Sequence, residues 1–308
     1  MKRRSQQDIS SLMLFLDHVK SYTGDDLIFG PSAGQTINHY TDLAGLKGII
    51  DNHDLWLTHS RYSNDDEEVT HGFEIVKEVI DENKNTAADD VKKDFLIKLS
   101  DLVKEPAPEG IYICCFCLND NLLSQWRGYG ANGTGVCIRF MPQGFSYITG
   151  IDSPQKGLMR IWKVFYDREL QKNIVREAIN FAYMDPALLL EEKLKRAADA
   201  IHFFIPTFKN AGFSEENECR LIFTPPPDFK VLPQVRVARG MLVPYYSLRK
   251  LSEDAEPNAL AIKKLPVLSV QIGPSSNKKL NMESAKILLS AANYDDVAVD
   301  SSSTPYRG

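Results

Sequence analysis

The sequence has little of several features that would each indicate a particular class of protein. Only 5 cysteines occur in 308 residues, an odd and small number that does not suit the disulfide framework of a secreted domain. No apolar run approaches the roughly eighteen residues that a membrane span needs. The basic start Met1–Arg4 leads into polar residues rather than into the apolar segment of a secretory signal. We therefore expect a cytoplasmic protein that does not associate with membranes.

The chain also lacks an excess of positive charge. Its formal net charge is −5 at pH 7, so we do not expect a broad surface that binds nucleic acid without sequence preference. The charge is uneven, because residues 1–110 carry 12 Lys and Arg against 21 Asp and Glu, whereas residues 111–308 carry 24 against 20. A small anionic ligand is therefore expected to contact the second part of the chain.

Common sequence signatures of nucleotide and metal sites are missing as well. We find neither a Walker motif nor the glycine fingerprint of a dinucleotide-binding fold. Cys114, Cys115 and Cys117 lie close together, but no neighbouring histidine completes a tetrahedral set of metal ligands. We interpret these cysteines as small buried apolar residues and expect no metal site.

The pattern of apolar residues predicts an α+β fold, in which helices flank a mixed and mainly antiparallel sheet. Residues 1–35 are predicted to form an N-terminal helical extension and residues 36–308 a single α+β domain. Helices are expected at 7–22, 42–50, 69–82, 88–104, 121–129, 168–183, 187–209 and 281–292. Strands are expected at 36–40, 54–58, 111–116, 135–140, 164–166, 218–223, 229–238, 241–245, 267–272 and 297–299.

Two clusters in the first third of the chain combine polar and aromatic side chains. In the first, a strand would place His39 and Thr41 on one face, where a ligand could meet an imidazole and a hydroxyl together. The alternative is a partly buried histidine bonded to backbone. The second cluster runs from Arg61 to Glu68 and is largely explained as the cap of the following helix. It also contains Tyr62, whose ring is available for stacking.

Two further clusters lie in the later part of the chain. Trp126 and Tyr129 are three residues apart on a predicted helical turn and share a face, and the glycines that follow permit close approach of a ligand. A strand beginning before residue 218 would align Glu216, Glu218 and Arg220 on one face. Either these charges bind a ligand, or they form an ion pair at an exposed sheet edge. The sequence leaves both interpretations open.

Taken in order, these clusters and several other short motifs resemble a bacterial family catalogued as a domain of unknown function. Some members of that family are linked to phage defence and abortive infection. The chain departs from the family pattern at Cys117, where a serine is expected, and at Thr304, where an aliphatic residue is expected. The matching motifs are His39-Tyr40-Thr41, Leu55–Thr58, Asn64-Asp65 with Glu68, Trp126 with Tyr129 and Gly130, Gly135 with Ile138, Glu216 with Glu218 and Arg220, Gly273-Pro274 and Ser303–Arg307.

A more distant resemblance suggests a reaction. An early strand with His-Tyr-Thr, a central aromatic residue and a late Glu-x-Glu are similar in order to the His-Tyr-Glu arrangement of ADP-ribosyltransferases. The resemblance implies a fold of that kind with NAD as the substrate. It also implies that Glu218 bonds the 2′-hydroxyl of the nicotinamide ribose, that Glu216 orients or deprotonates a nucleophile, and that Arg220 or Arg127 meets the pyrophosphate. The implied site consists of catalytic Glu218, Glu216 and His39 and of NAD-binding His39, Tyr40, Thr41, Tyr62, Asn64, Trp126, Arg127, Tyr129 and Arg220.

Three hypotheses about function follow. The first is an NAD-using ADP-ribosyltransferase-like enzyme or NAD glycohydrolase that acts in bacterial phage defence or as a toxin. We expect His39, Trp126 and Glu218 to line a single pocket, and their placement on separate surfaces would exclude this hypothesis. The second is a non-catalytic module that senses a nucleotide or a phage component and acts through a partner protein of a defence system. The third is a metal-dependent nuclease that uses Asp65, Glu68, Glu216 and Glu218. The sequence leaves open which molecule would accept ADP-ribose, what would activate the protein, and its oligomeric state.

Overall fold

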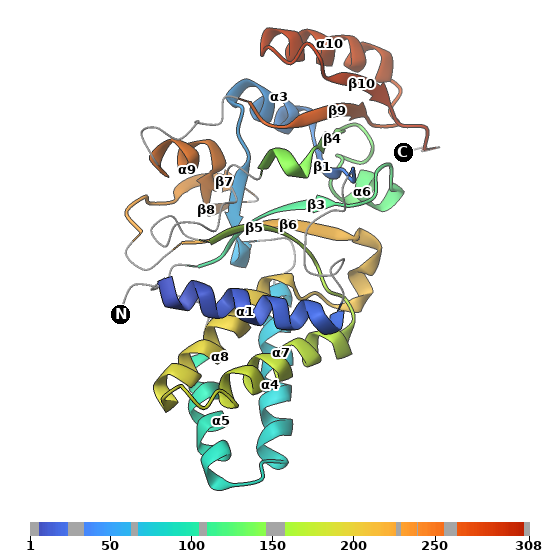
Figure 1. The fold of residues 1–308 in the computed structure, drawn as a ribbon. Coiled ribbons are helices and arrows are strands. Elements are labelled where there is room, and N and C mark those ends of the chain that lie inside the picture. Colours follow the sequence, from blue (N-terminus) through green and yellow to red (C-terminus); the bar gives the residue numbers. More distant parts are fainter. Residues whose placement is uncertain are drawn as a thin grey trace.

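The computed structural model describes residues 6–23, 34–62, 67–104, 110–145, 158–225, 229–238, 240–255 and 264–304. Helices flank a mixed, mostly antiparallel sheet, which confirms the predicted α+β class (Figure 1). Among the helices of these ranges, we find none with the length and hydrophobicity that a bilayer span requires.

The described strands form a single sheet around β3 and β6. From one edge to the other the order is β10-β9-β4-β1-β3-β2-β8-β7, while β6 pairs with β3 and β5 pairs with β6. β9 and β10 run parallel, and the remaining pairs are antiparallel. The strands are β1 (Ile37–Thr41), β2 (Trp56–His59), β3 (Tyr112–Cys117), β4 (Val136–Phe140), β5 (Leu158–Lys163), β6 (Glu218–Thr224), β7 (Gln234–Ala238), β8 (Met241–Ser247), β9 (Val267–Ile272) and β10 (Ala298–Ser301).

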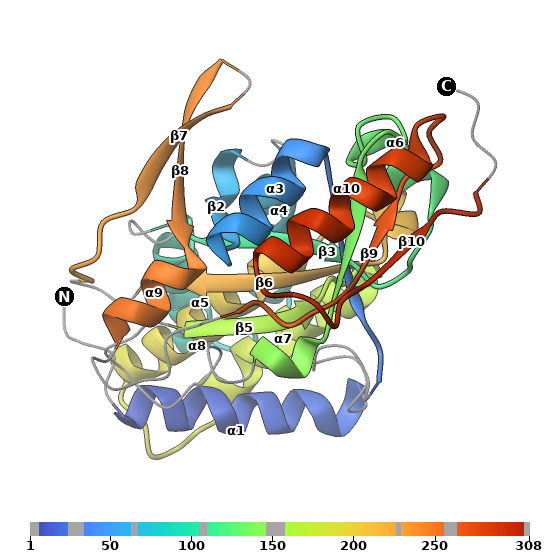
Figure 2. The same ribbon diagram turned by 90° about the horizontal axis from the view of Figure 1, so that it is seen from above.

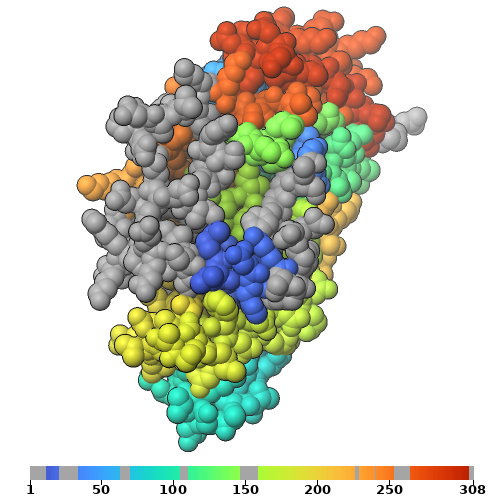
Figure 3. All heavy atoms as spheres, in the orientation of Figure 1, coloured from blue at the N-terminus to red at the C-terminus, as the bar shows by residue number. Residues whose placement is uncertain are grey.

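The helices form layers on opposite sides of this sheet. In Figure 1, α1, α4, α5, α7 and α8 lie below β5 and β6, whereas α3, α9 and α10 lie above. Figure 3 shows the residues of α4 and α5 at one end of the molecule and those of α10 at the other. The helices are α1 (Gln6–Thr23), α3 (Leu43–Asn52), α4 (Glu67–Asn85), α5 (Asp90–Leu102), α6 (Leu123–Gly128), α7 (Arg168–Tyr183), α8 (Leu190–Phe204), α9 (Leu248–Ala255) and α10 (Lys278–Ala291).

Because both faces of the central strands are covered, each face has its own apolar core. Ile113 and Ile222 face the layer of α1, α7 and α8, where Phe15 from the predicted N-terminal extension is also buried. Cys114 and Leu221, one residue along each strand, face the opposite core. Burial on both faces explains why β3 is almost continuously apolar rather than alternating, whereas β6 is apolar only from Leu221 to Phe223 and begins with buried charged residues.

The sheet divides at one edge of β3. Along its other edge β3 pairs with β6 over its full length. At the divided edge β2 pairs with Tyr112 and Ile113, and β1 pairs only with Cys117. The stretch of β3 between these two pairings therefore borders a split in the sheet.

Two predicted elements differ from the structure, and one helix of the structure was not predicted. The strand expected at 164–166 is instead β5 at Leu158–Lys163, where Arg160 is buried with its guanidinium 3.9 Å from the Phe203 ring centroid. A charged residue in the middle of the segment conceals the strand pattern. The helix expected over 187–209 ends at Phe204 and gives way to a 3-10 turn containing Pro206. α9 was not predicted.

Candidate functional site

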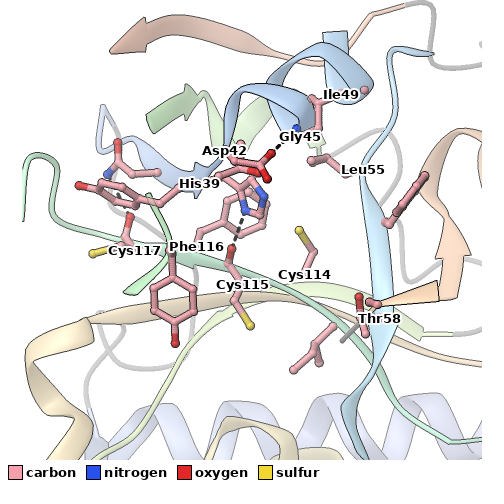
Figure 4. A pocket seen from close by; sticks show the side chains of 18 of the residues that line it. His39, Asp42, Gly45, Ile49, Leu55, Thr58, Cys114, Cys115, Phe116 and Cys117 are labelled. Atoms are coloured by element: carbon pink, nitrogen blue, oxygen red, sulfur yellow. Dashed lines mark hydrogen bonds between the residues drawn. The ribbon is translucent and has the colours of Figure 1, made fainter. Parts of the chain in front are cut away.

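A cavity of about 630 Å³ lies at the split between β1 and β2, within the size range of small-ligand sites. Its wall includes Cys114 and Phe116 from one face of β3 and Cys115 and Cys117 from the other. In Figure 4 the side chains of Cys114 and Cys115 point to opposite sides of β3. The cavity therefore reaches both faces of the sheet.

The end of β1 and the first turn of α3 form one wall of the cavity. Asp42 caps α3, since its Oδ1 accepts a hydrogen bond of 2.6 Å from the backbone N–H of Gly45. A side chain at position 45 would place its Cβ 2.0 Å from Oγ1 of Thr41. Glycine suits this position because any Cβ here would also lie 3.1 Å from Cβ of Thr41, so the Thr41 side chain would have to shift.

His39 bonds the backbone at the split. Its Nδ1 lies 3.0 Å from the carbonyl oxygen of Cys115 (Figure 4). A carbonyl only accepts, so Nδ1 carries the proton. Burial lowers the pKa of His39, which favours the neutral imidazole and leaves Nε2 as an acceptor. The predicted alternative of a partly buried histidine bonded to backbone is thus confirmed, and His39 lines the cavity as well.

Glu216, Glu218 and Lys209 also line the cavity, and Arg220 bonds Glu218 without lining the cavity. Lys209 Nζ donates to Glu216 Oε2 at 2.5 Å and to Glu218 Oε2 at 3.0 Å. Arg220 donates from Nε and Nη2 to the two oxygens of Glu218, at 2.7 and 2.8 Å, and from Nη1 to the Pro206 carbonyl at 2.8 Å. Burial by itself would raise the pKa of Glu218, but Arg220 and Lys209 outweigh it and lower the pKa to about 2. Glu218 is therefore ionised at neutral pH.

The exposed-edge interpretation of these charges is wrong. β6 lies between β3 and β5, and Glu218 and Arg220 are only 5% and 2% exposed. Glu216 is not on the strand as predicted, because it ends a 3-10 helix and Asn217 then takes a left-handed conformation with φ of 41°. Glu216 and Glu218 nevertheless lie together because both bond Lys209.

Lys209 is a site residue that the sequence did not reveal. It was assigned to the end of the predicted helix 187–209, where a lysine is ordinary. In the structure Lys209 follows the 3-10 turn after α8 and is buried between the carboxylates. No local motif marks it, because its two carboxylate partners are the last residue of the following 3-10 helix, Glu216, and the first residue of β6, Glu218.

Tyr129 and Trp126 occupy different environments. The Tyr129 hydroxyl donates to Glu216 Oε1 at 3.2 Å, and its side chain lines the cavity. Trp126 is fully buried, with its ring centroid 5.0 Å from that of Tyr40 and its indole N–H donating to Asn121 Oδ1 at 3.2 Å. The expectations that Trp126 contacts NAD and that it shares a face with Tyr129 are therefore wrong. α6 ends at Gly128, so Tyr129 leaves the helical spacing.

The remaining predicted residues divide into three groups. Tyr40, Thr41 and Tyr62 line the cavity with His39, although Tyr40 is mostly buried and its hydroxyl accepts from the Leu122 N–H. Arg220 and the exposed Arg127 are not among the residues that line it. The Arg220 guanidinium bonds Glu218 and the Pro206 carbonyl, so its predicted contact with a pyrophosphate has no support from this cavity and stays a prediction. The third group lies outside the described residues or side chains: Asn64, Asp65 and Glu68.

One known family matches the segment of the chain that contains Glu216 and Glu218. Residues 125–221 match a family model described as "Protein of unknown function (DUF2971)". This match confirms the predicted resemblance to a domain of unknown function. It spans Tyr129, Lys209, Glu216 and Glu218 but not His39. No curated protein and no solved structure matches the chain.

The chemistry available in the cavity follows from these groups. A neutral imidazole, a phenol and a carboxylate pair held by two cations can bind hydroxyl or amide groups and can stabilise a developing positive charge. Within the described ranges, no three or more His, Cys, Asp or Glu side chains are grouped so that they could hold a metal ion.

Proposed function

We propose that the cavity binds NAD and that the protein cleaves the bond between nicotinamide and ribose, as an ADP-ribosyltransferase-like enzyme or an NAD glycohydrolase. One observation supports this proposal. His39, Tyr129 and the pair Glu216 and Glu218, which come from three separate regions of the sequence, line one cavity. Trp126, which was expected beside them from the sequence, is instead buried against Tyr40 and does not line the cavity, so the proposal assigns its role to Tyr129 from the same segment.

The two glutamates have different roles in this proposal. The oxygens of Glu218 already accept three hydrogen bonds from Arg220 and Lys209, which leaves little capacity for a ribose hydroxyl. Glu216 is more accessible, with its side chain 19% exposed against 6% for Glu218. We therefore assign contact with the ribose to Glu216, and we assign to Glu218 the positioning of Lys209.

The reaction places positive charge where a carboxylate can stabilise it. The glycosidic bond breaks with its electron pair moving to the nicotinamide nitrogen, and the ribose carbon becomes positively charged. The Glu216 carboxylate stabilises this charge more strongly in the transition state than in bound NAD. Water or an acceptor hydroxyl then bonds to that carbon and gives its proton to Glu216. With water the products are nicotinamide, ADP-ribose and a proton.

The other side chains bind the nicotinamide half. His39 Nε2 accepts from the carboxamide N–H or from a ribose hydroxyl, and the ring of Tyr129 or Tyr62 packs against the base. Tyr129 also bonds Glu216, so ligand stacking and carboxylate position are linked through one side chain.

The deciding assay measures nicotinamide release from NAD by the purified full chain, with and without protein and nucleic-acid acceptors. We expect Glu216→Gln to lower the rate by about a hundredfold or more, in line with the loss of one transition-state charge contact. Glu215→Gln is the matched control, because Glu215 is the exposed neighbouring residue and its replacement should leave the rate unchanged. Equal turnover by all three proteins would exclude Glu216 from this role. No nicotinamide from the wild type under any condition would refute the enzyme.

A second candidate is a non-catalytic nucleotide sensor that acts through a partner protein. It is favoured because several polar groups of the cavity already bond other protein groups and so have less capacity to take part in a reaction. Glu218 is held by Arg220 and Lys209, and His39 bonds the Cys115 carbonyl. Calorimetry that shows NAD binding with no nicotinamide formed would support the sensor over the enzyme.

The biological setting that we propose is bacterial phage defence or toxin action in the cytoplasm. Bacteria that express the wild type are expected to yield fewer phage plaques than bacteria that express Glu216→Gln. Equal plaque numbers, at equal protein levels, would contradict this setting.

A further inference from the structure

The end of the cavity away from Glu216 carries aromatic and cationic side chains that the proposed reaction does not use. Trp56 and Thr58 come from β2, and Arg236 comes from β7 of the β7–β8 hairpin, which projects from the rest of the sheet in Figure 2. The pairing of Thr58 with Tyr245 and of Arg236 with Val243 puts these side chains on one face. Three neighbouring strands therefore build this end of the cavity.

The side chains there are held in contact. Arg236 Nη2 donates to Thr58 Oγ1 at 3.1 Å, and its guanidinium carbon lies 5.3 Å from the Trp56 ring centroid. The Trp56 ring packs on Tyr245, with centroids 4.5 Å apart and an interplanar angle of 33°. Trp56 is still 43% exposed, so part of the indole remains accessible to a ligand. A supported aromatic surface thus lies beside a cation at the cavity wall.

We infer that this end is a subsite for a nucleotide, which binds phosphate at Arg236 and stacks an aromatic base on Trp56. A guanidinium presents paired N–H donors that match phosphate oxygens, and nucleobases stack on exposed indole rings. The inference rests on the proposed function for the other half of the ligand. It assigns the phosphates to Arg236 instead of the Arg220 or Arg127 expected from the sequence.

The charges in the rest of the cavity favour this location. Lys209 is the other cationic side chain among the described lining residues, and it lies between Glu216 and Glu218, which repel an anion. Asp54 also lines the cavity, at the same end as Trp56, with which its side chain interacts. Its pKa is raised by burial, and its Oδ1 accepts from the Arg249 N–H at 2.9 Å. The wall at Arg236 is therefore the more favourable place for a phosphate.

The arrangement fixes the direction in which a dinucleotide binds. Its phosphates and second base lie against β2, β7 and β8, and its nicotinamide ribose lies against His39 and Glu216. ADP, which has a base and two phosphates but no nicotinamide, should occupy the Arg236 end alone. Free nicotinamide should occupy the other end.

Calorimetry with the full chain tests the subsite with three probes: ADP, inorganic pyrophosphate and nicotinamide. We expect Arg236→Gln to weaken ADP and pyrophosphate binding by about tenfold or more, because a charge-assisted contact is lost, and to leave nicotinamide binding unchanged. Trp56→Leu should weaken ADP binding but not pyrophosphate binding. Arg61→Gln is the control, since Arg61 is exposed near Tyr62 but does not line the cavity.

Two results would overturn the inference. One is a wild type that does not bind ADP at millimolar concentration, and the other is equal weakening of ADP binding by Arg61→Gln and Arg236→Gln. If Arg236→Gln fails to fold, Arg236→Lys keeps the charge without the paired donors and should retain part of the ADP affinity. Because the readout is binding at equilibrium, ADP binding without nicotinamide release would refute the proposed reaction and leave the subsite supported.

Discussion

Replacing Arg220 with methionine removes the main counter-ion of a buried carboxylate. The wild-type cluster is balanced, with Lys209 and Arg220 opposite Glu216 and Glu218. Arg220→Met preserves much of the side-chain volume but leaves the cluster with one unbalanced negative charge. It also leaves the Pro206 carbonyl without the donor that Arg220 supplies at 2.8 Å.

The expected cost follows from the burial of this pair. Removing one partner of a buried ion pair typically costs about 3–5 kcal/mol, because the other charge is left uncompensated in the interior. Lys209 remains 3.0 Å from Glu218 Oε2, so we expect Arg220→Met to lower the free energy of unfolding by about 3 kcal/mol. Adding Glu218→Gln restores neutrality, and the double variant should therefore be more stable than Arg220→Met alone.

Urea denaturation at pH 7, followed by circular dichroism, measures these differences. The matched control is Arg168→Met, which breaks an ion pair with Glu78 in which the Arg168 side chain is 52% exposed. We expect it to cost about 1 kcal/mol or less. The reasoning would be refuted if Arg220→Met were no more destabilising than Arg168→Met, or if Glu218→Gln destabilised the Arg220→Met protein further.

Three other predictions follow from the same structure. The folded-state pKa of Glu218 is about 2, against an ordinary value of 4.5. Its contribution to stability is therefore complete above pH 4.5 and is lost as the pH falls toward 2. Thermal midpoints measured against pH should show this loss in the wild type and less of it in Glu218→Gln. Trp126→Ala should lower the free energy of unfolding, measured by urea denaturation, by about 3–5 kcal/mol, as expected for a fully buried indole. Tyr129→Phe removes one hydrogen bond at a residue that is 39% exposed, and it should lower this free energy by about 1 kcal/mol or less. Gly45→Ala should lower the free energy of unfolding by about 1–3 kcal/mol, because the added Cβ would clash with the Thr41 side chain. Gly48→Ala in the same helix meets nothing within 4 Å and should be neutral or stabilising. A lower thermal midpoint for Gly48→Ala than for Gly45→Ala would contradict the close approach of residue 45 to Thr41.

Most elements were predictable because their signals are local. The helix predicted over 168–183 is α7, with the same bounds, since the spacing of its apolar residues and the cap at Asp167 both lie within the segment. The strand in which Arg160 is buried was missed for the opposite reason. The environment that accepts this guanidinium is supplied by Phe203, from a helix more than forty residues further along the chain.

The site divides in the same way. The sequence marked His39, Tyr129, Glu216 and Glu218 as chemically unusual, and all four line the cavity. It also marked Trp126 for the ligand, but the ring packs on Tyr40 in the core. It gave no sign of Lys209 or Arg236, because a single lysine or arginine in a polar stretch carries no distinguishing local pattern.

By itself the sequence determined the α+β class, the approximate position of most helices and strands, and the short motifs that contain the polar groups of the site. Each of these depends on neighbours along the chain. Only the tertiary structure decided that β1 and β2 pair with different parts of β3, so that a cavity forms between them. It also decided which charges are buried as pairs and which face that cavity. These outcomes depend on contacts between segments that lie up to about a hundred residues or more apart, such as β3 and β6. A local sequence pattern does not indicate how favourable such contacts are.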